Sequence, residues 1–177
     1  MTWPIEHFHY MPAPSSFIEM MPGAMKAMTQ CAGVKNGENV VIACDTNKMR
    51  LAEALAAAAF AAGGVPTIVA FPPTGAHGRQ VPKAVVGACA RCDVFFLPTS
   101  WSMTHTDARI EASRNGARGA TMCEVTEDCL CTGGILGDYE ENDRLGRKLG
   151  AVMAKGKTIR MTSDGGTELI ARIKDRP

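Results

Sequence analysis

Aromatic side chains, basic runs and long apolar stretches are all scarce in this chain. Aromatic residues make up 6% of its 177 residues, and the formal net charge is +1. No lysine- or arginine-rich run is present, which argues against a nucleic-acid-binding face and against binding to an anionic membrane surface. The most apolar run, 51–62, is too short to cross a bilayer, so no membrane-spanning segment is expected.

Signals for export and for a disulfide framework are also lacking. The first ten residues have no basic segment followed by an apolar one, so they do not form a signal peptide. The seven cysteines are odd in number and come without an export signal, so we expect them to be mostly small buried hydrophobes rather than disulfide partners. These absences favour a soluble cytoplasmic protein.

Short β-branched runs alternate in this sequence with Ala-rich helical stretches. Helices are predicted at 48–62, 82–90, 104–115 and 138–155, and strands at 39–44, 66–71, 93–98, 119–123 and 158–162. Apolar strands without polar alternation indicate a parallel sheet that is covered on both faces. The predicted fold class is therefore α/β, a doubly wound, mostly parallel sheet with helices on both faces in a Rossmann-like three-layer arrangement.

The two ends of the chain differ from this pattern. Residues 1–15 are Pro-rich and are predicted to form an irregular arm, whereas 16–177 are predicted to form a single α/β domain. A first helix over 16–32 contains Pro22 and Gly23, so its regular part is predicted to begin there. An alternating strand is predicted at 168–174.

The segment Ser100-Trp-Ser-Met-Thr-His-Thr106 follows a predicted buried strand and opens a helix. Ligands of open α/β sheets bind beyond the carboxyl ends of the strands. If Ser102 or Thr104 caps the helix, His105 lies in its first turn, where the helix dipole favours a neutral imidazole. His105 is therefore the candidate acid–base residue, and Ser102, Thr104 and Thr106 are candidate substrate-binding residues. The alternative is a histidine that only satisfies the helix end.

A second polar segment, Cys44-Asp-Thr-Asn47, ends the first predicted strand. Asp45 or Thr46 is expected to cap the helix that follows. Asp45 and Asn47 are also candidates to contact a polar group of a substrate at this edge of the sheet.

Two cysteine pairs have spacings close to those of metal or redox motifs. Cys89 and Cys92 lie at a helix end before a strand, where the helix dipole raises a thiol pKa and disfavours redox chemistry. A zinc site would need two more ligands, and the one-residue gap between Cys129 and Cys131 suits a zinc knuckle poorly. We therefore predict no zinc site from these residues.

Three histidines outside these segments have simple explanations. His7 and His9 share one face of the irregular arm and would need a third ligand to bind a metal, while His77 lies in a loop between Gly75 and Gly78. We interpret all three as incidental; the alternative for His77 is an approach to an active cleft or a partner. We predict no complete metal site within this chain.

Three segments, 34–47, 96–106 and 116–128, resemble in order and spacing the N-terminal domain of the thermophilic metallo-aminopeptidase family, which comprises aminopeptidase T and leucyl aminopeptidase-like proteins. The same superfamily includes the 2,5-dihydroxypyridine 5,6-dioxygenases. The resemblance covers 16–174. Family members carry their Glu, His, Tyr and Asp metal ligands in a C-terminal half that has no counterpart in these 177 residues.

The resemblance implies that the chain is the substrate-cleft domain or subunit of a metal-dependent enzyme and is inactive alone. A second domain or partner subunit would supply the ligands for a divalent metal (Zn, Co or Fe(II)), within a homo- or hetero-oligomer. The substrate would be a small polar or aromatic molecule, with peptide and aromatic ring left open. The chain could be a fragment, a subunit or a shortened relative; the competing hypothesis is a non-catalytic module for small-ligand binding or assembly.

Overall fold

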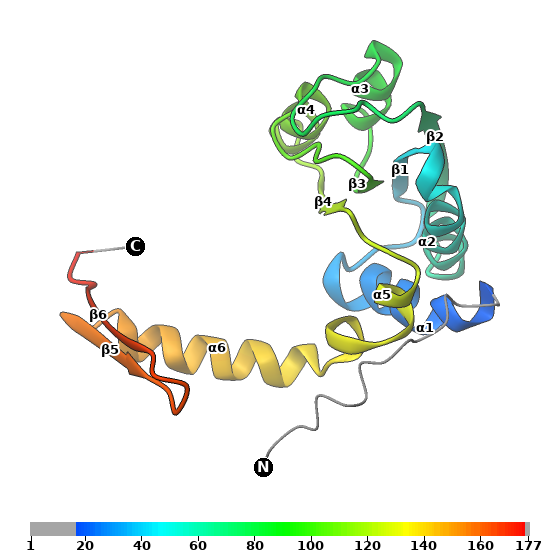
Figure 1. Ribbon diagram of the computed structural model, residues 1–177. Helices are drawn as coiled ribbons and strands as arrows, with labels where there is room; N and C mark the ends of the chain where they lie inside the picture. Colours follow the sequence, from blue (N-terminus) through cyan, green and yellow to red (C-terminus); the bar gives the residue numbers. More distant parts are fainter. Residues whose placement is uncertain (1–16, 176–177) are drawn as a thin grey trace. The chain divides into compact units, whose positions relative to one another are not determined.

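The computed structural model describes residues 17–175, which divide into two compact units (Figure 1). The first unit ends at Gly137 and the second begins at Asp138. The sequence instead predicts one domain over 16–177, so the structure differs from that prediction in its last forty residues. None of the described helices is both long enough and apolar enough to span a bilayer.

The first unit is built on a four-stranded sheet in which all neighbouring strands run parallel. The strand order along the sheet is β2-β1-β3-β4. The strands are β1 (Asn39–Asp45), β2 (Val65–Phe71), β3 (Val94–Thr99) and β4 (Arg118–Cys123). All four lie within one residue of their predicted bounds at each end. β1, β2 and β3 are short apolar runs with turn residues on both sides, and β4 is a weaker run that follows Gly116.

Helices cover both faces of this sheet, which confirms the predicted fold class (Figure 1). The helices are α1 (Phe17–Lys26), α2 (Met49–Ala61), α3 (Lys83–Cys89), α4 (Asp107–Arg114) and α5 (Asp128–Cys131). In the central strands, Val40, Ile42 and Phe96 pack with α1, α2 and α5. Val41 and Phe95 face the other way and pack with α3 and α4. This alternation buries two cores, one on each face.

The first helix begins earlier than predicted. It runs continuously from Phe17 through Pro22 and ends in a π-helical turn, η2 (Ala27–Cys31). A Cβ on Gly23 would lie 2.1 Å from the carbonyl oxygen of Leu130, so the backbones of α1 and α5 are in direct contact at that point. This packing, together with the burial of Met20, outweighs the hydrogen bond that Pro22 cannot make.

The second unit consists of α6 (Tyr139–Met153) followed by two strands, β5 (Thr158–Thr162) and β6 (Glu168–Arg172). The sequence predicts that 158–162 extends the parallel sheet, but β5 pairs antiparallel with β6 in a separate two-stranded sheet. The connection is a tight turn in which Ser163 N donates to Thr167 O, and Gly166 has φ 91°. So short a connection permits only antiparallel pairing.

Apolar side chains of this second unit remain exposed. On α6, Leu145, Leu149 and Val152 follow helical spacing and are 47%, 60% and 66% exposed. On the hairpin, Met161 and Ile170 are 54% and 66% exposed. Leu145, Leu149 and Val152 form an exposed apolar stripe on α6, and such a stripe is typical of a site that another polypeptide covers.

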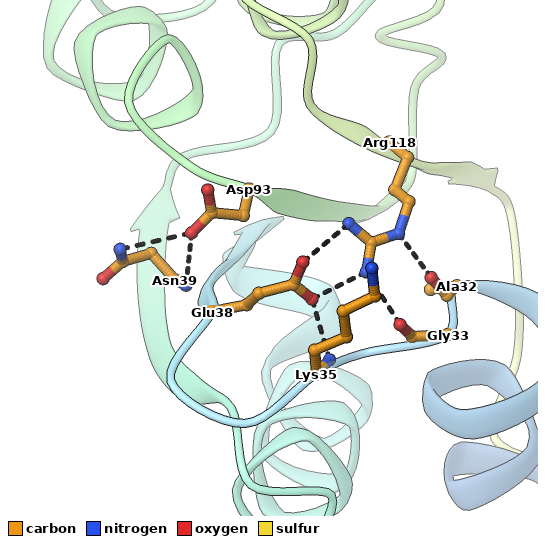
Figure 2. A network of polar contacts seen from close by, with 7 residues as sticks. All are labelled: Ala32, Gly33, Lys35, Glu38, Asn39, Asp93 and Arg118. Atoms are coloured by element: carbon orange, nitrogen blue, oxygen red, sulfur yellow. Dashed lines mark hydrogen bonds and ion pairs between the residues drawn. The ribbon is translucent and has the colours of Figure 1, made fainter.

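At the amino-terminal edge of the parallel sheet, an ion pair joins β4 to the segment before β1 (Figure 2). Arg118 Nη1 and Nη2 donate to the two carboxylate oxygens of Glu38 at 2.9 and 2.6 Å. Arg118 Nε also donates to Ala32 O at 2.6 Å, and Lys35 N donates to Glu38 at 2.8 Å. The hydrogen bonds from Arg118 and from Lys35 N hold the pKa of Glu38 at about 2.

Glu38→Gln is therefore expected to destabilise the protein in a pH-dependent way. A carboxyl group whose pKa is lowered on folding contributes stability above its unfolded value of 4.5, and this contribution is lost as the pH falls toward about 2. Because the Arg118 side chain is 41% exposed, solvent screening limits the effect at pH 7 to about 1–2 kcal/mol. Urea unfolding at pH 7 and pH 2.5 measures it.

The control is Glu111→Gln, which changes an exposed carboxyl group on α4. We expect that variant to unfold like the parent at both pH values. A Glu38→Gln deficit of equal size at pH 7 and pH 2.5 would contradict the role given to the ionised carboxylate.

Candidate functional site

The carboxyl ends of β1 and β3 are adjacent in the sheet, yet the chain leaves them in opposite directions. After β1 it continues into α2 on one face, and after β3 it continues into α4 on the other face. Such a switch point leaves a crevice between the two outgoing segments, and ligands of open α/β sheets bind there. The polar segments predicted from the sequence both begin at this edge.

Asp45, the last residue of β1, bridges the switch point. Its side chain is 1% exposed and accepts hydrogen bonds from Ser100 N and, at 3.1 Å, from Ser100 Oγ. It also accepts from Asn47 N at 3.1 Å and caps the 3-10 turn η3 (Thr46–Lys48), whereas the sequence predicts that Asp45 or Thr46 caps the helix itself, whose N-cap is Lys48. Asn47 Nδ2 donates to Ser100 Oγ at 3.3 Å. Asp45 and Asn47 thus fix the position of the segment that follows β3.

An open pocket of about 360 Å³ lies beside Asn47. Two contacts join the two segments that line this pocket. Lys48 Nζ donates to Val125 O at 2.7 Å, and Arg50 forms an ion pair with Glu127 at 3.0 Å. The pocket is lined by residues from the start of α2 and from the segment after β4: Thr46, Asn47, Lys48, Met49, Arg50, Leu51, Thr126 and Glu127. Hydroxyl, amide and charged groups make this pocket suitable for a polar ligand.

His105 lies in an exposed turn and makes no hydrogen bond to another described residue. The expectation that Ser102 or Thr104 caps the helix and leaves His105 in its first turn is wrong, because the helix is capped at Thr106. His105 precedes the cap, so the helix-dipole argument for its neutral form does not apply at that position. Its role as an acid–base residue stays a prediction.

The three hydroxyl residues around His105 have different environments. Thr106 is fully buried, and its Oγ1 donates to Met103 O at 2.7 Å, so in this conformation its hydroxyl serves the turn. Ser102 Oγ donates to Thr104 Oγ1 at 3.0 Å, which in turn donates to Thr121 Oγ1 at 3.2 Å. Ser102 and Thr104 thus form part of a hydroxyl chain that joins the turn to β4.

His77, interpreted from the sequence as an incidental loop residue, contacts the same turn. Its Nδ1 accepts a hydrogen bond from Ser102 N at 3.1 Å, and its ring lies 5.0 Å from that of Trp101 at an interplanar angle of 68°. Cys123 Sγ, at the end of β4, lies 3.9 Å from the same nitrogen. The sequence signal that could have found His77 is its place in a loop after a predicted strand, at the carboxyl edge where ligands bind.

The residue after β4 has an unusual backbone. Glu124 has φ 58°, in the left-handed region that non-glycine residues rarely adopt, and its N donates to Thr99 O at 2.8 Å. Such a conformation costs about 1 kcal/mol or more and is found often at functional sites. It brings an exposed carboxylate to the same edge of the sheet.

The cysteine pair with motif-like spacing is buried and inert. Burial raises the pKa of Cys89 to about 12 and that of Cys92 to about 11. Cys92 Sγ donates to Cys89 O at 3.1 Å. Both thiols therefore stay protonated near neutral pH and pack as small hydrophobes.

Within residues 17–175, no three His, Cys, Asp or Glu side chains lie close enough together to hold a metal ion. His7 and His9 lie outside the described residues. Among the described residues, no set of three such side chains forms a site for a resident catalytic metal on its own.

No family model matches the chain, and no curated protein does. Among solved structures, the fold is similar to that of 2,5-dihydroxypyridine dioxygenase from Pseudomonas putida KT2440, with a TM-score of 0.65 and 14% sequence identity. The likeness covers 90% of this chain but 48% of that one, so the chain spans about half the length of its neighbour. At this identity the likeness shows the fold.

Proposed function

We propose that this chain forms the substrate-cleft half of a metal-dependent enzyme similar to 2,5-dihydroxypyridine dioxygenase, and that a second domain or subunit supplies the metal ligands. The observation that carries the proposal is the fold likeness, which uses nearly all of this chain and about half of the dioxygenase. The other half of that neighbour has no counterpart here. The aminopeptidase side of the resemblance remains a prediction from sequence.

The exposed apolar surface of α6 and the β5–β6 hairpin supports this proposal. Leu149, Val152 and Ile170 are each at least 60% exposed, and no residue of α6 is buried. A unit of about forty residues rarely buries enough apolar surface to be stable alone. A second domain or subunit that covers this surface would supply the missing core.

In this proposal the carboxyl edge of the parallel sheet is one wall of the cleft. His105, exposed and without a hydrogen-bond partner among the described residues, is available to exchange a proton with the substrate. Ser102 and Thr104 offer hydroxyls for polar groups of the substrate. Asp45 and Asn47 hold Ser100, and with it the segment after β3, in place through hydrogen bonds. A bound divalent metal would supply the activation of oxygen in a dioxygenase, or of water in a peptidase.

A non-catalytic assembly module is the second candidate function. The same exposed apolar surface on α6 and the hairpin favours it, because such a surface can join two polypeptides without any chemistry. Turnover by the assembled complex separates the two candidates.

The test is to isolate the tagged chain with its bound partner from its native cells and to assay that complex. In the presence of Fe(II) and oxygen we expect the complex to consume 2,5-dihydroxypyridine, which is measured as a loss of the substrate's ultraviolet absorbance. Hydrolysis of leucine p-nitroanilide in the presence of Zn or Co tests the peptidase alternative. His105→Ala in this complex should lower turnover about a hundredfold and leave thermal unfolding unchanged.

Lys35→Ala, at the opposite edge of the sheet, is the matched control and should keep full turnover. A complex that turns over neither substrate would refute the enzymatic proposal. Full turnover by His105→Ala would refute the acid–base role alone.

A further inference from the structure

The loop between β2 and α3 is tied to the turn after β3 by two hydrogen bonds. Gly78 N donates to Ser102 O at 2.9 Å, and Ser102 N donates to His77 Nδ1 at 3.1 Å. The two segments are distant in sequence, yet Ser102 uses its backbone O to accept from Gly78 N and its backbone N to donate to the His77 ring. His77 is therefore held at a defined position on the carboxyl edge of the sheet.

These contacts decide which ring nitrogen of His77 carries the proton. A backbone N–H can only donate, so Nδ1 of His77 must be the unprotonated acceptor, and the neutral imidazole carries its hydrogen on Nε2. Cys123 Sγ lies 3.9 Å from the same nitrogen, and its S–H can share the single lone pair of Nδ1 with Ser102 N–H. Burial and the neighbouring carboxylate of Glu124 raise the pKa of Cys123, which keeps its hydrogen available for this contact.

The Nε2–H group has no hydrogen-bond partner among residues 17–175, and His77 is an exposed residue. The indole of Trp101, half-buried, lies next to it with the ring centroids 5.0 Å apart and the planes at 68°. A flat apolar surface beside a fixed N–H donor suits a ligand that combines a planar ring with an oxygen acceptor.

We propose that His77 and Trp101 form a binding site for an aromatic or heteroaromatic anion, whose carboxylate or phenolate oxygen accepts a hydrogen bond from His77 Nε2–H while its ring packs against Trp101. The site shares with the proposed function only its place at the carboxyl edge of the sheet. It needs no metal, so it can be tested on this chain alone.

The test uses two substitutions that separate the two ring nitrogens of His77. Asn places an amide oxygen near the position of Nδ1, so His77→Asn keeps the acceptor for Ser102 N–H and removes the outer donor. Gln reaches the position of Nε2, so His77→Gln keeps an outer N–H donor. Benzoate is titrated into the ¹⁵N-labelled chain, and the shift of the Trp101 indole N–H gives the dissociation constant.

We expect benzoate to bind the parent chain. Its dissociation constant should be about tenfold higher for His77→Asn and within about threefold of the parent value for His77→Gln. Trp101→Leu should weaken binding about tenfold, and Arg91→Ala, an exposed residue that follows α3, should leave it unchanged. Long-range ¹⁵N–¹H spectra at pH 8 should show His77 entirely as the Nε2–H form.

Three outcomes would overturn the inference. If benzoate does not bind the parent chain, or if it binds His77→Asn as tightly as the parent, His77 Nε2–H is not the donor for the ligand. Acetate that binds as tightly as benzoate removes the role of Trp101. A proton on Nδ1 in the spectra removes the geometric premise. None of these results depends on whether the assembled enzyme turns over a substrate.

Discussion

Gly119→Ala is expected to destabilise the protein by about 3 kcal/mol, because β4 has no room for a side chain at this position. Gly119 pairs with Phe95 of β3, and a Cβ on it would lie 1.9 Å from Phe95 O and 2.8 Å from Phe95 C. These atoms belong to a buried central strand and cannot move away cheaply. The two strands would have to separate, which would weaken the pairing of β4 with the sheet. Urea unfolding followed by circular dichroism measures the loss.

Gly87→Ala is the matched control for this substitution. Gly87 lies inside helix α3, and a Cβ there would meet no heavy atom within 4 Å. Alanine favours helix over glycine, so this variant should be stabilised by about 0.5–1 kcal/mol. Equal unfolding midpoints for the two variants would contradict the close approach of β4 to β3.

Asp45→Ala is expected to lower the free energy of unfolding by about 3 kcal/mol and also to disturb the segment at the carboxyl edge of the sheet. The Asp45 carboxylate, 1% exposed, accepts hydrogen bonds from the backbone N–H groups of Asn47 and Ser100. Alanine leaves both donors unpaired where water reaches them poorly. Because Ser100 begins the segment that carries Ser102, we also expect the amide signals of 100–106 to shift in NMR spectra, together with the loss of stability.

The control for Asp45 is a carboxylate at the opposite edge of the sheet. Asp93 accepts from Asn39 N at 2.8 Å and from Asn39 Nδ2 at 3.3 Å, but it is exposed. Water can replace its side chain, so Asp93→Ala should cost about 1 kcal/mol. If the two alanine variants lost equal stability, burial could not be the reason for the importance of Asp45.

The parallel sheet could be predicted because each of its strands carries a local signal. β1 and β3 are apolar runs with turn residues at both ends. After α2 and its C-cap Ala62 comes Gly63, whose φ of 90° suits the residue that follows a helix. The partner of β5 could not be predicted in this way. Its sequence indicates a strand, but the choice of β6 over the parallel sheet depends on the tight turn at 163–167.

The candidate site was predictable in place but not in detail. The position of Asp45 and of 100–106 at the carboxyl edge follows from the strand order that the alternating pattern implies. The turn before α4 does not, because it depends on Thr106 N and Oγ1 both donating to Met103 O, which moves the helix cap past His105. The contact between His77 and Ser102 is non-local and leaves no trace in either segment alone.

We propose that this chain supplies one wall of a substrate cleft and that another domain or subunit holds the metal. Calorimetric titration of the purified chain with Zn²⁺, Co²⁺ and, under anaerobic conditions, Fe²⁺ tests it most directly, because it includes every residue of the chain, His7 and His9 among them. We expect metal to remain substoichiometric after gel filtration of the chain alone and to reach one tightly held ion per chain only when the partner is bound. One tightly held ion in the isolated chain would contradict it.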